Sequence, residues 1–193
     1  MLVHGTRHQV PALSNPEMLR IGGVTYEAFT TSGGLGTMAE TYEGAVETLD
    51  YTSIRYPGHL AGMHLLLEEL RFKDTPGELV QRMRLALPPD EEDWVLVHAS
   101  AQGHKHGTLQ TQALVMEYRP IVLGHRTRTA IAWTTAAALV AVVELVSKGT
   151  LPQRGFVKQE DIPLLAFLTT TTGQLFATHH PALRALGGGA PWI

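Results

Sequence analysis

The sequence predicts an α/β fold, α+β by strict count, in which a mixed, largely antiparallel sheet is covered by helices. Segments rich in strand-forming residues alternate with turn signals at residues 24–30, 46–56, 93–101 and 108–118. Apolar residues at helical spacing run from Leu60 to Leu70, and a long Ala-rich apolar run spans residues 130–146. We expect these two helices to cover one face of the sheet, while the other face meets a partner.

The elements between these segments are predicted from turn and cap residues. A tight turn at Gly22-Gly23 leads into the first strand, and Thr75-Pro76-Gly77-Glu78 has the spacing of a capping box that opens a helix to about Leu87. Glycines in the connection 102–107 predict a hairpin between the third and fourth strands. A further strand is predicted at residues 119–124, and the long helix is expected to end at residues 148–149. A short last helix is expected to open at residues 160–163.

One domain is expected, because 193 residues can bury about 70% of their unfolded surface around a single core. Pro11 and Asn15-Pro16 discourage regular structure, so residues 1–20 are predicted to be an irregular lead-in. The domain proper is expected over residues 21–175. Residues 176–193, which include three consecutive glycines, are predicted to be a flexible tail.

Composition excludes several classes of function. The 15 Lys+Arg against 18 Asp+Glu give a net charge of −3, which argues against nucleic acid or an anionic membrane surface as a partner. Without cysteine there is no disulfide, thiolate nucleophile or cysteine-based metal site, which fits a cytoplasmic protein. The start lacks a secretory signal. The apolar run 130–146 contains Thr134, Thr135 and Glu144 and falls short of the ~20 strongly apolar residues of a membrane span, so a core helix is expected.

The sharpest chemical signal lies where a strand pattern stops at Pro57-Gly58 and a helical pattern begins. The first N–H groups of a helix lack intrahelical partners and carry the positive end of the helix dipole. Arg55, Tyr56 and His59 surround this helix start, so they are candidates for an anion-binding site. Two plainer interpretations stay open at this point, an ion pair of Arg55 at the surface and a tight strand-to-helix turn without a ligand.

Two other motifs are predicted to carry no chemistry. The segment Gly34-Leu35-Gly36-Thr37-Met38-Ala39 matches the G-x-G-x-x-A form of the dinucleotide fingerprint, but Gly44 interrupts the helix that a Rossmann unit requires. His98, His104 and His106 could share a hairpin face, yet no carboxylate stands at a ligand spacing, so no metal site is expected. No G-x-S-x-G elbow or G-x-x-x-x-G-K-[ST] phosphate loop occurs, and autonomous catalysis is not expected.

A family resemblance is carried by the same segments. Residues 48–59, Thr-Leu-Asp-Tyr-Thr-Ser-Ile-Arg-Tyr-Pro-Gly-His, resemble the T-[LI]-R-Y-P-G-H segment of the saccharopine dehydrogenase superfamily, close to its lysine 6-dehydrogenase branch. Residues 26–35 resemble the E-A-F-x-[ST]-x-G-L loop of that branch. The hairpin, the Thr-Thr-Ala-Ala helix and residues 155–162 follow in the family's order, so the resemblance covers about residues 11–175.

The resemblance implies the C-terminal substrate-binding and dimerisation domain of an NAD(P)-dependent amino-acid oxidoreductase, which acts on CH–NH or CH–NH2 groups. NAD or NADP would be held by an N-terminal Rossmann domain that is expected to be absent from this chain, so the chain is not expected to be active alone. The implied partners are that Rossmann domain, an amino acid such as lysine or saccharopine, and a second copy in a homodimer. The alternative is a non-catalytic oligomerisation or small-molecule-binding module.

The same resemblance places the site residues around the helix start. Arg55 and the N–H groups at Gly58 would bind a substrate carboxylate, and Tyr56 would form a hydrogen-bonding wall. His59 is the candidate catalytic residue on its chemistry alone, because imidazole is suited to proton transfer near neutral pH. The loop that would close against substrate and nicotinamide divides into substrate-binding Thr31 and Ser32 and cofactor-proximal Gly33, Gly34 and Leu35.

Overall fold

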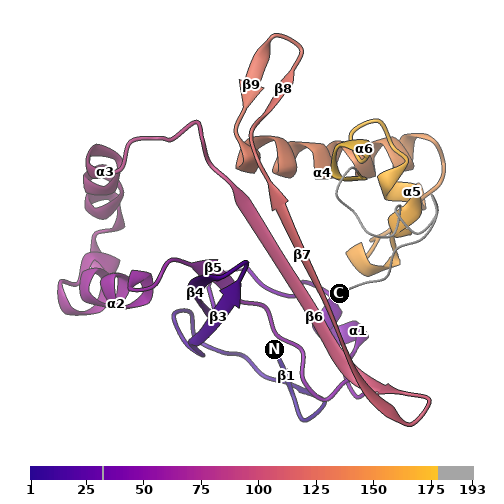
Figure 1. Cartoon of the computed structure of the whole chain (residues 1–193), viewed down its shortest axis with the longest axis horizontal. Coiled ribbons are helices and arrows are strands. Elements are labelled where there is room, and N and C mark those ends of the chain that lie inside the picture. Colours follow the sequence, from indigo (N-terminus) through magenta and orange to yellow (C-terminus); the bar gives the residue numbers. More distant parts are fainter. Residues whose placement is uncertain (32, 178–193) are drawn as a thin grey trace. The chain divides into compact units, whose positions relative to one another are not determined.

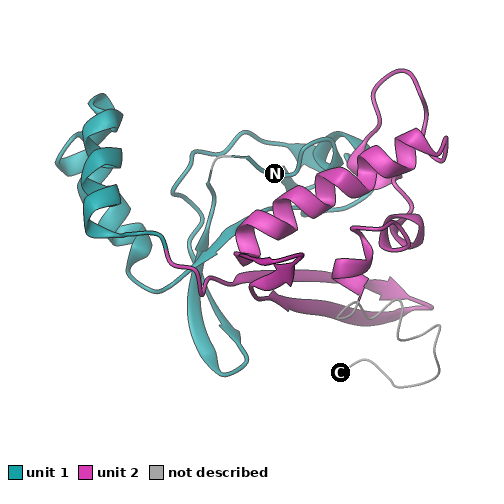
Figure 2. Ribbon diagram, turned by 90° about the horizontal axis from the view of Figure 1, so that it is seen from above, with its two compact units in different colours: residues 1–89 teal, residues 90–193 magenta. Residues whose placement is uncertain are grey.

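The computed structural model describes residues 1–31 and 33–177, and the chain divides into two compact units, residues 1–89 (unit 1) and the part from Asp90 onward (unit 2; Figure 2). Helices make up about 34% and strands about 27% of the structure, so the predicted mixed α/β class is confirmed. The strands form several small antiparallel sheets, whereas the sequence predicted one sheet. The boundary between the units falls inside the domain that the sequence predicted over residues 21–175.

Unit 1 contains two antiparallel sheets, whose strands other than β2 are labelled in Figure 1. The smaller sheet pairs β1 (Leu2–Val3) with β2 (Thr6–Arg7). The larger sheet has the strand order β3 (Glu17–Ile21), β4 (Val24–Phe29) and β5 (Ser53–Arg55). Gly22 and Gly23 have φ of +58° and +84°, so they form the predicted two-residue turn between β3 and β4. The central strand β4 contributes Tyr26, Ala28 and Phe29 to the core.

The prediction of an irregular lead-in over residues 1–20 is wrong, because β1, β2 and most of β3 lie in it. Pro16 stands just before β3 and takes no part in its pairing, while the glycine turn sets Glu17 opposite Ala28. Pairing with a partner strand therefore outweighs the local effect of the prolines. The strand predicted over 46–56 is shorter than expected, because only β5 pairs with β4.

The helical elements of unit 1 are short. In chain order they are α1 (Met38–Thr41), α2 (His59–His64), the π-helix η1 (Leu65–Glu69), the 3-10 helix η2 (Phe72–Asp74) and α3 (Pro76–Ala86). α2 continues into η1 and follows the predicted apolar pattern, although none of their residues is fully buried. α3 confirms the predicted helix, but the Thr75 side chain makes no capping hydrogen bond, so the predicted capping box is not formed.

Unit 2 contains two hairpins and a set of helices. The hairpins pair β6 (Val95–Lys105) with β7 (Thr108–Tyr118) and β8 (Ile121–Leu123) with β9 (Arg126–Arg128). The helices are α4 (Ala130–Ser147), the 3-10 helix η3 (Gln159–Asp161), α5 (Leu164–Leu168) and α6 (Gln174–Ala177). The long β6–β7 ribbon turns at His106-Gly107, both at positive φ, so its connection is shorter than the predicted 102–107 (Figure 1). The tail predicted over 176–193 overlaps the end of α6, and the remainder lies outside the described residues.

The core of unit 2 forms where α4 packs against β7. Trp133 and Ala137 of α4 are buried together with Met116 and Tyr118 of β7. The rings of Trp133 and Tyr118 meet edge to face at 5.4 Å, and the indole N–H donates to the carbonyl of Arg119 at 2.8 Å. Burial raises the pKa of the Tyr118 phenol, whose hydroxyl donates to Met116 Sδ at 3.4 Å. This contact anchors the long apolar helix on a sheet, as its composition required.

One stripe of α4 is buried and the opposite face is exposed. The buried residues recur at helical spacing and are Ala130, Trp133, Ala137, Ala141 and Leu145. The exposed apolar residues are Ile131, Leu139, Val140 and Val143, which are 47–68% exposed. The helix ends at the predicted Lys148-Gly149 pair, with Gly149 at φ +73°. Over residues 1–31 and 33–177, α4 is the one helix whose length and composition would suffice to cross a membrane.

Candidate functional site

The two segments that carry the resemblance meet on adjacent strands of unit 1. Antiparallel pairing sets Glu27 of β4 opposite Arg55 of β5, and Phe29 opposite Ser53. Thr31 therefore lies near the start of β5, and the turn that contains Tyr56 begins at its end. Because β5 is only three residues long, these two groups are separated by about 10 Å of strand. The structure thus places Thr31, Arg55 and Tyr56 of the predicted site at the two ends of one short strand.

The start of α2 already holds a carboxylate, that of Glu27. Its Oε1 accepts a hydrogen bond from the Leu60 N–H at 2.6 Å, and its Oε2 accepts one from the Gly58 N–H at 3.0 Å. The prediction that this helix start attracts an anion agrees with this geometry, but the anion belongs to the chain itself. The N–H groups assigned to a substrate carboxylate are consequently hydrogen-bonded within the protein, and Arg55 remains as the cationic group for a ligand.

The same hydrogen bonds keep Glu27 ionised. The Leu60 N–H has the largest effect and lowers the pKa of the Glu27 carboxyl below its ordinary value, although burial partly opposes it. The N–H groups of Gly58 and His59 and the charge of His59 lower this pKa further. Gly58, whose N–H donates to Glu27, lies at φ +95°, a left-handed conformation that glycine adopts without strain. A fixed negative charge is therefore part of the site.

Tyr56 and His59 are held by rings of β4. The Tyr56 ring lies 5.8 Å from that of buried Tyr26, and the His59 ring stacks on buried Phe29 with 6.1 Å between centroids. Tyr56 is nevertheless 61% exposed, so much of the residue is accessible to solvent although its ring lies near that of Tyr26. His59 is likewise exposed. Both predicted residues are thus positioned by the core of unit 1 and accessible to a ligand, as a polar wall and a proton-transfer group require.

Arg55 lies on the surface beside Glu27. Its Nη1 donates to the carbonyl of Ile54 at 2.8 Å. In the described part of the chain no carboxylate forms an ion pair with Arg55, not even Glu27 directly across the strand pair. The plainer interpretation of Arg55 as one half of a surface ion pair is therefore not observed in the described residues. Arg55 is exposed, and its fork-shaped guanidinium can bind a carboxylate through two parallel hydrogen bonds.

The glycine loop begins next to β5. The Thr31 and Ser53 hydroxyls are 2.6 Å apart, which ties the end of β4 to β5, whereas Ser32 lies outside the described residues. Gly33 and Gly34 are exposed, and no atom stands within 4 Å of where a Cβ would be, so their backbone is open to a ligand. Leu35 is half-buried. The structure ties Thr31 to the strand that carries Arg55, but it shows no contact between the glycines and Arg55.

The fingerprint-like glycines do not form a dinucleotide site. They are followed by α1, which is four residues long, and the strand pairs in residues 1–31 and 33–177 are all antiparallel. A Rossmann unit instead needs a helix of some dozen residues and a parallel strand. The described residues, which include the histidines of the β6–β7 hairpin, contain no group of three or more His, Asp or Glu that could hold a metal ion.

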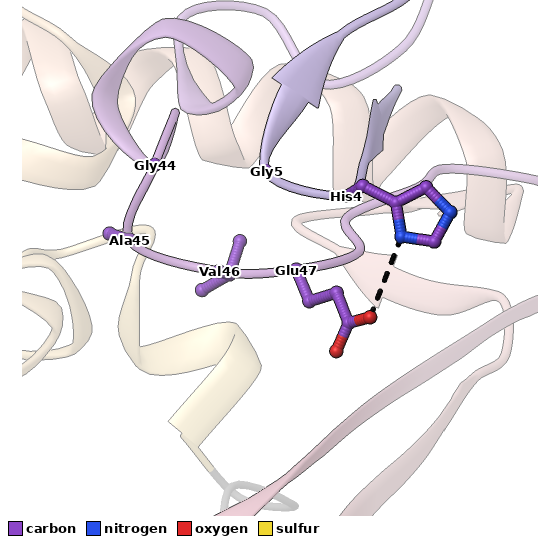
Figure 3. A pocket seen from close by; sticks show the side chains of 6 residues that line it. All are labelled: His4, Gly5, Gly44, Ala45, Val46 and Glu47. Atoms are coloured by element: carbon purple, nitrogen blue, oxygen red, sulfur yellow. Dashed lines mark ion pairs between the residues drawn. The ribbon is translucent and has the colours of Figure 1, made fainter.

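A shallow hollow of unit 1 is lined by residues of the β1–β2 turn and of the segment after α1, namely His4, Gly5, Gly44, Ala45, Val46 and Glu47. Figure 3 shows the His4 ring turned toward the Glu47 carboxylate, with 3.6 Å between Nδ1 and Oε1. Both side chains are at least 80% exposed, so this pair contributes little energy. None of the predicted site residues lines the hollow, and it does not extend the site.

Sequence reasoning missed the role of Glu27, although this residue opens the E-A-F segment. The signal that could have found it is the register of the strand pair, since the residue opposite Arg55 must lie within reach of the turn that follows. It also missed Ser53, the partner of Thr31, for the same reason. A comparison of the chain with protein-family models finds no match.

Proposed function

We propose that this chain is the C-terminal substrate-binding and dimerisation part of an NAD(P)-dependent amino-acid oxidoreductase similar to lysine 6-dehydrogenase and saccharopine dehydrogenase. The resemblance of residues 26–35 and 48–59 to two motifs of that superfamily supports this assignment. One structural observation carries it further. The β4–β5 pairing joins these two segments and places exposed Arg55 at the end of β5, directly before the turn that carries the exposed residues Tyr56 and His59.

Each residue then has a role that its surroundings support. Arg55 binds the substrate carboxylate, and Tyr56 provides a hydrogen-bonding wall at its side. His59, stacked on Phe29, is the candidate for proton transfer at the amine or imine nitrogen. The loop from Thr31 onward covers the substrate from the other end of β5. The work of these residues is to orient an amino acid and to exclude water from it.

In this proposal the nicotinamide cofactor is held outside the residues described. NAD or NADP would accept or deliver the hydride, but no parallel strand–helix–strand unit occurs in the described residues, so their geometry does not fit a dinucleotide. A Rossmann domain outside these residues would have to hold it. The 193-residue chain is accordingly expected to need that domain for activity.

Isothermal titration with lysine and with saccharopine tests this function. Wild-type chain is expected to bind at least one of them, and Arg55→Ala is expected to weaken that binding at least about tenfold, because a charge-assisted hydrogen-bond pair is lost. Arg82→Ala removes an equally charged, exposed side chain of α3 and serves as the control. Absence of binding by the wild type, or equal affinities for Arg55→Ala and Arg82→Ala, contradicts the proposal.

A non-catalytic oligomerisation module is the second candidate. The observation that favours it is the exposed apolar face of α4, where Ile131, Leu139, Val140 and Val143 are 47–68% exposed. A large exposed apolar patch often marks a protein interface. Light scattering after size exclusion measures the oligomeric state. A dimer that binds neither amino acid supports the module, and a dimer that binds one through Arg55 supports the enzyme.

A further inference from the structure

We infer that Glu27 is a positioning residue of the Arg55 site: its carboxylate, held by the first N–H groups of α2, orients the turn that carries Tyr56 and His59 and is kept from neutralising Arg55. The role of Glu27 in ligand binding rests on the proposed function, whereas the hydrogen bonds of Glu27 are observed whatever that function is. The Glu27 side chain arises from β4, and both hydrogen-bonded donors lie beyond β5, so the carboxylate connects two elements across the sheet edge.

The two hydrogen bonds define the orientation of the turn. Gly58 and Leu60 donate to different oxygens of one planar carboxylate, at 3.0 and 2.6 Å, and His59 lies between them in the chain. Two contacts on a rigid planar group leave the peptide units from 58 to 60 little freedom to rotate. The His59 ring is thereby directed onto Phe29 and the Tyr56 ring toward Tyr26. Glu27 acts on a ligand through these side chains.

The same hydrogen bonds explain why Arg55 is available. Opposite charges that face each other on antiparallel strands normally attract, and Glu27 and Arg55 are directly paired. They form no ion pair: both Glu27 oxygens accept from backbone N–H groups, and Arg55 Nη1 donates to the Ile54 carbonyl. An exposed ion pair between two flexible side chains would in any case contribute little stability. Glu27 thus supplies the geometry of the site, and Arg55 keeps its positive charge for an anion.

Nuclear magnetic resonance of the 193-residue chain tests the positioning role. The amide signals of Gly58 and Leu60 are followed between about pH 2 and pH 7 in wild type, Glu27→Gln and Glu69→Gln; these pH limits bracket the usual carboxyl range. The charged groups that face Glu27 are His59 of α2 and Arg55 of β5, and its neighbour on β3 is Met18. Glu69 lies on η1, is exposed and serves as the matched control for loss of charge.

Wild type and Glu69→Gln are expected to show a step in both amide shifts as Glu27 protonates, below the ordinary glutamate range, whereas Glu27→Gln shows none. Hydrogen exchange at Gly58 and Leu60 is expected to rise about tenfold in Glu27→Gln, while β4 amides stay protected. Glu27→Asp keeps the charge but shortens the reach, so its step should be smaller and nearer the ordinary carboxyl pKa. Amide shifts, pH steps and exchange in Glu27→Gln that equal those of wild type would overturn the inference.

The outcomes separate this inference from the proposed function. If the Gly58 and Leu60 amides respond to Glu27 but no amino acid binds, the positioning role stands and the enzymatic assignment fails. If lysine binds through Arg55 and neither the amides nor the affinity change in Glu27→Gln, the assignment stands and the positioning role fails. If Glu27→Gln loses the amide signals of β4, Glu27→Asp provides the test. Chemical-shift steps at Gly58 and Leu60 equal to those of wild type overturn the positioning role, and a smaller step at a shifted pH supports it.

Discussion

The starts of α2 and α4 are built alike and used differently. Glu27 accepts from the N–H groups of Gly58 and Leu60, and Asp93 accepts from those of Ala130 and Ile131 at 2.5 and 2.9 Å. In both cases the carboxylate comes from a segment more than 30 residues earlier in the chain. Each helix therefore begins at a carboxylate that tertiary structure has brought to it, and neither start is capped by the side chain of its own N-cap residue.

The surroundings of the two starts differ. α4 runs for 18 residues with a buried stripe against β7, so Asp93 fixes the position of a core helix. α2 is six residues long, with no residue buried, and its start is surrounded by Arg55, Tyr56 and His59. A carboxylate at a helix start thus stabilises a core at α4 and, in our inference, orients exposed side chains at α2. What distinguishes the two is whether the neighbouring groups are apolar and buried or polar and accessible.

The largest expected effect lies in the core beneath α4. Trp133→Ala removes a ring that is 4% exposed and its hydrogen bond to the Arg119 carbonyl, so it should lower the free energy of unfolding of unit 2 by about 3–5 kcal/mol. Denaturant unfolding followed by circular dichroism measures this loss. Ile131→Ala, on the exposed face of the same helix, should change it by less than about 0.5 kcal/mol. Equal losses in the two variants would show that the buried stripe is misassigned.

The next effect tests the start of α4. Asp93→Ala leaves the Ala130 and Ile131 N–H groups without their acceptor and should cost about 1–2 kcal/mol of unfolding free energy. The neighbouring, exposed Glu91→Ala changes the charge equally without touching the helix and is the control. Hydrogen exchange should rise first at Ala130 and Ile131. A loss of stability in Glu91→Ala as large as in Asp93→Ala would point to net charge as the cause.

The smallest effect is expected at the start of α2. Because folding lowers the pKa of Glu27, its contribution to stability is present in full above the ordinary glutamate pKa and is lost as pH falls through the lower folded-state pKa. Wild type should therefore lose stability relative to Glu27→Gln across that acidic interval, and the difference should be constant near neutral pH. Urea unfolding at stepped pH measures it. Parallel curves for the two proteins at all pH values would contradict the lowered pKa.

Local signals predicted a large part of the fold. The Gly22-Gly23 turn, the span of α3 and the end of α4 at Lys148-Gly149 depend on the conformational preferences of a few adjacent residues, and all three are confirmed. β3 was missed because its pairing is set by the turn that follows it, and because Pro16 next to it indicated irregular structure. The long connection predicted for the β6–β7 hairpin was wrong because His106 adopts positive φ, which local preference does not favour.

In the candidate site, too, local signals and long-range strand pairing determined different features. The sequence by itself determined that Arg55-Tyr56-Pro57-Gly58-His59 ends a strand, turns and opens a helix whose first N–H groups attract an anion. Only the tertiary structure decided that this anion is Glu27 and that Arg55 stays available to a ligand. The physical reason is that the register of β4 against β5 is a long-range property, and a shift of one residue would turn Glu27 to the other face of the sheet.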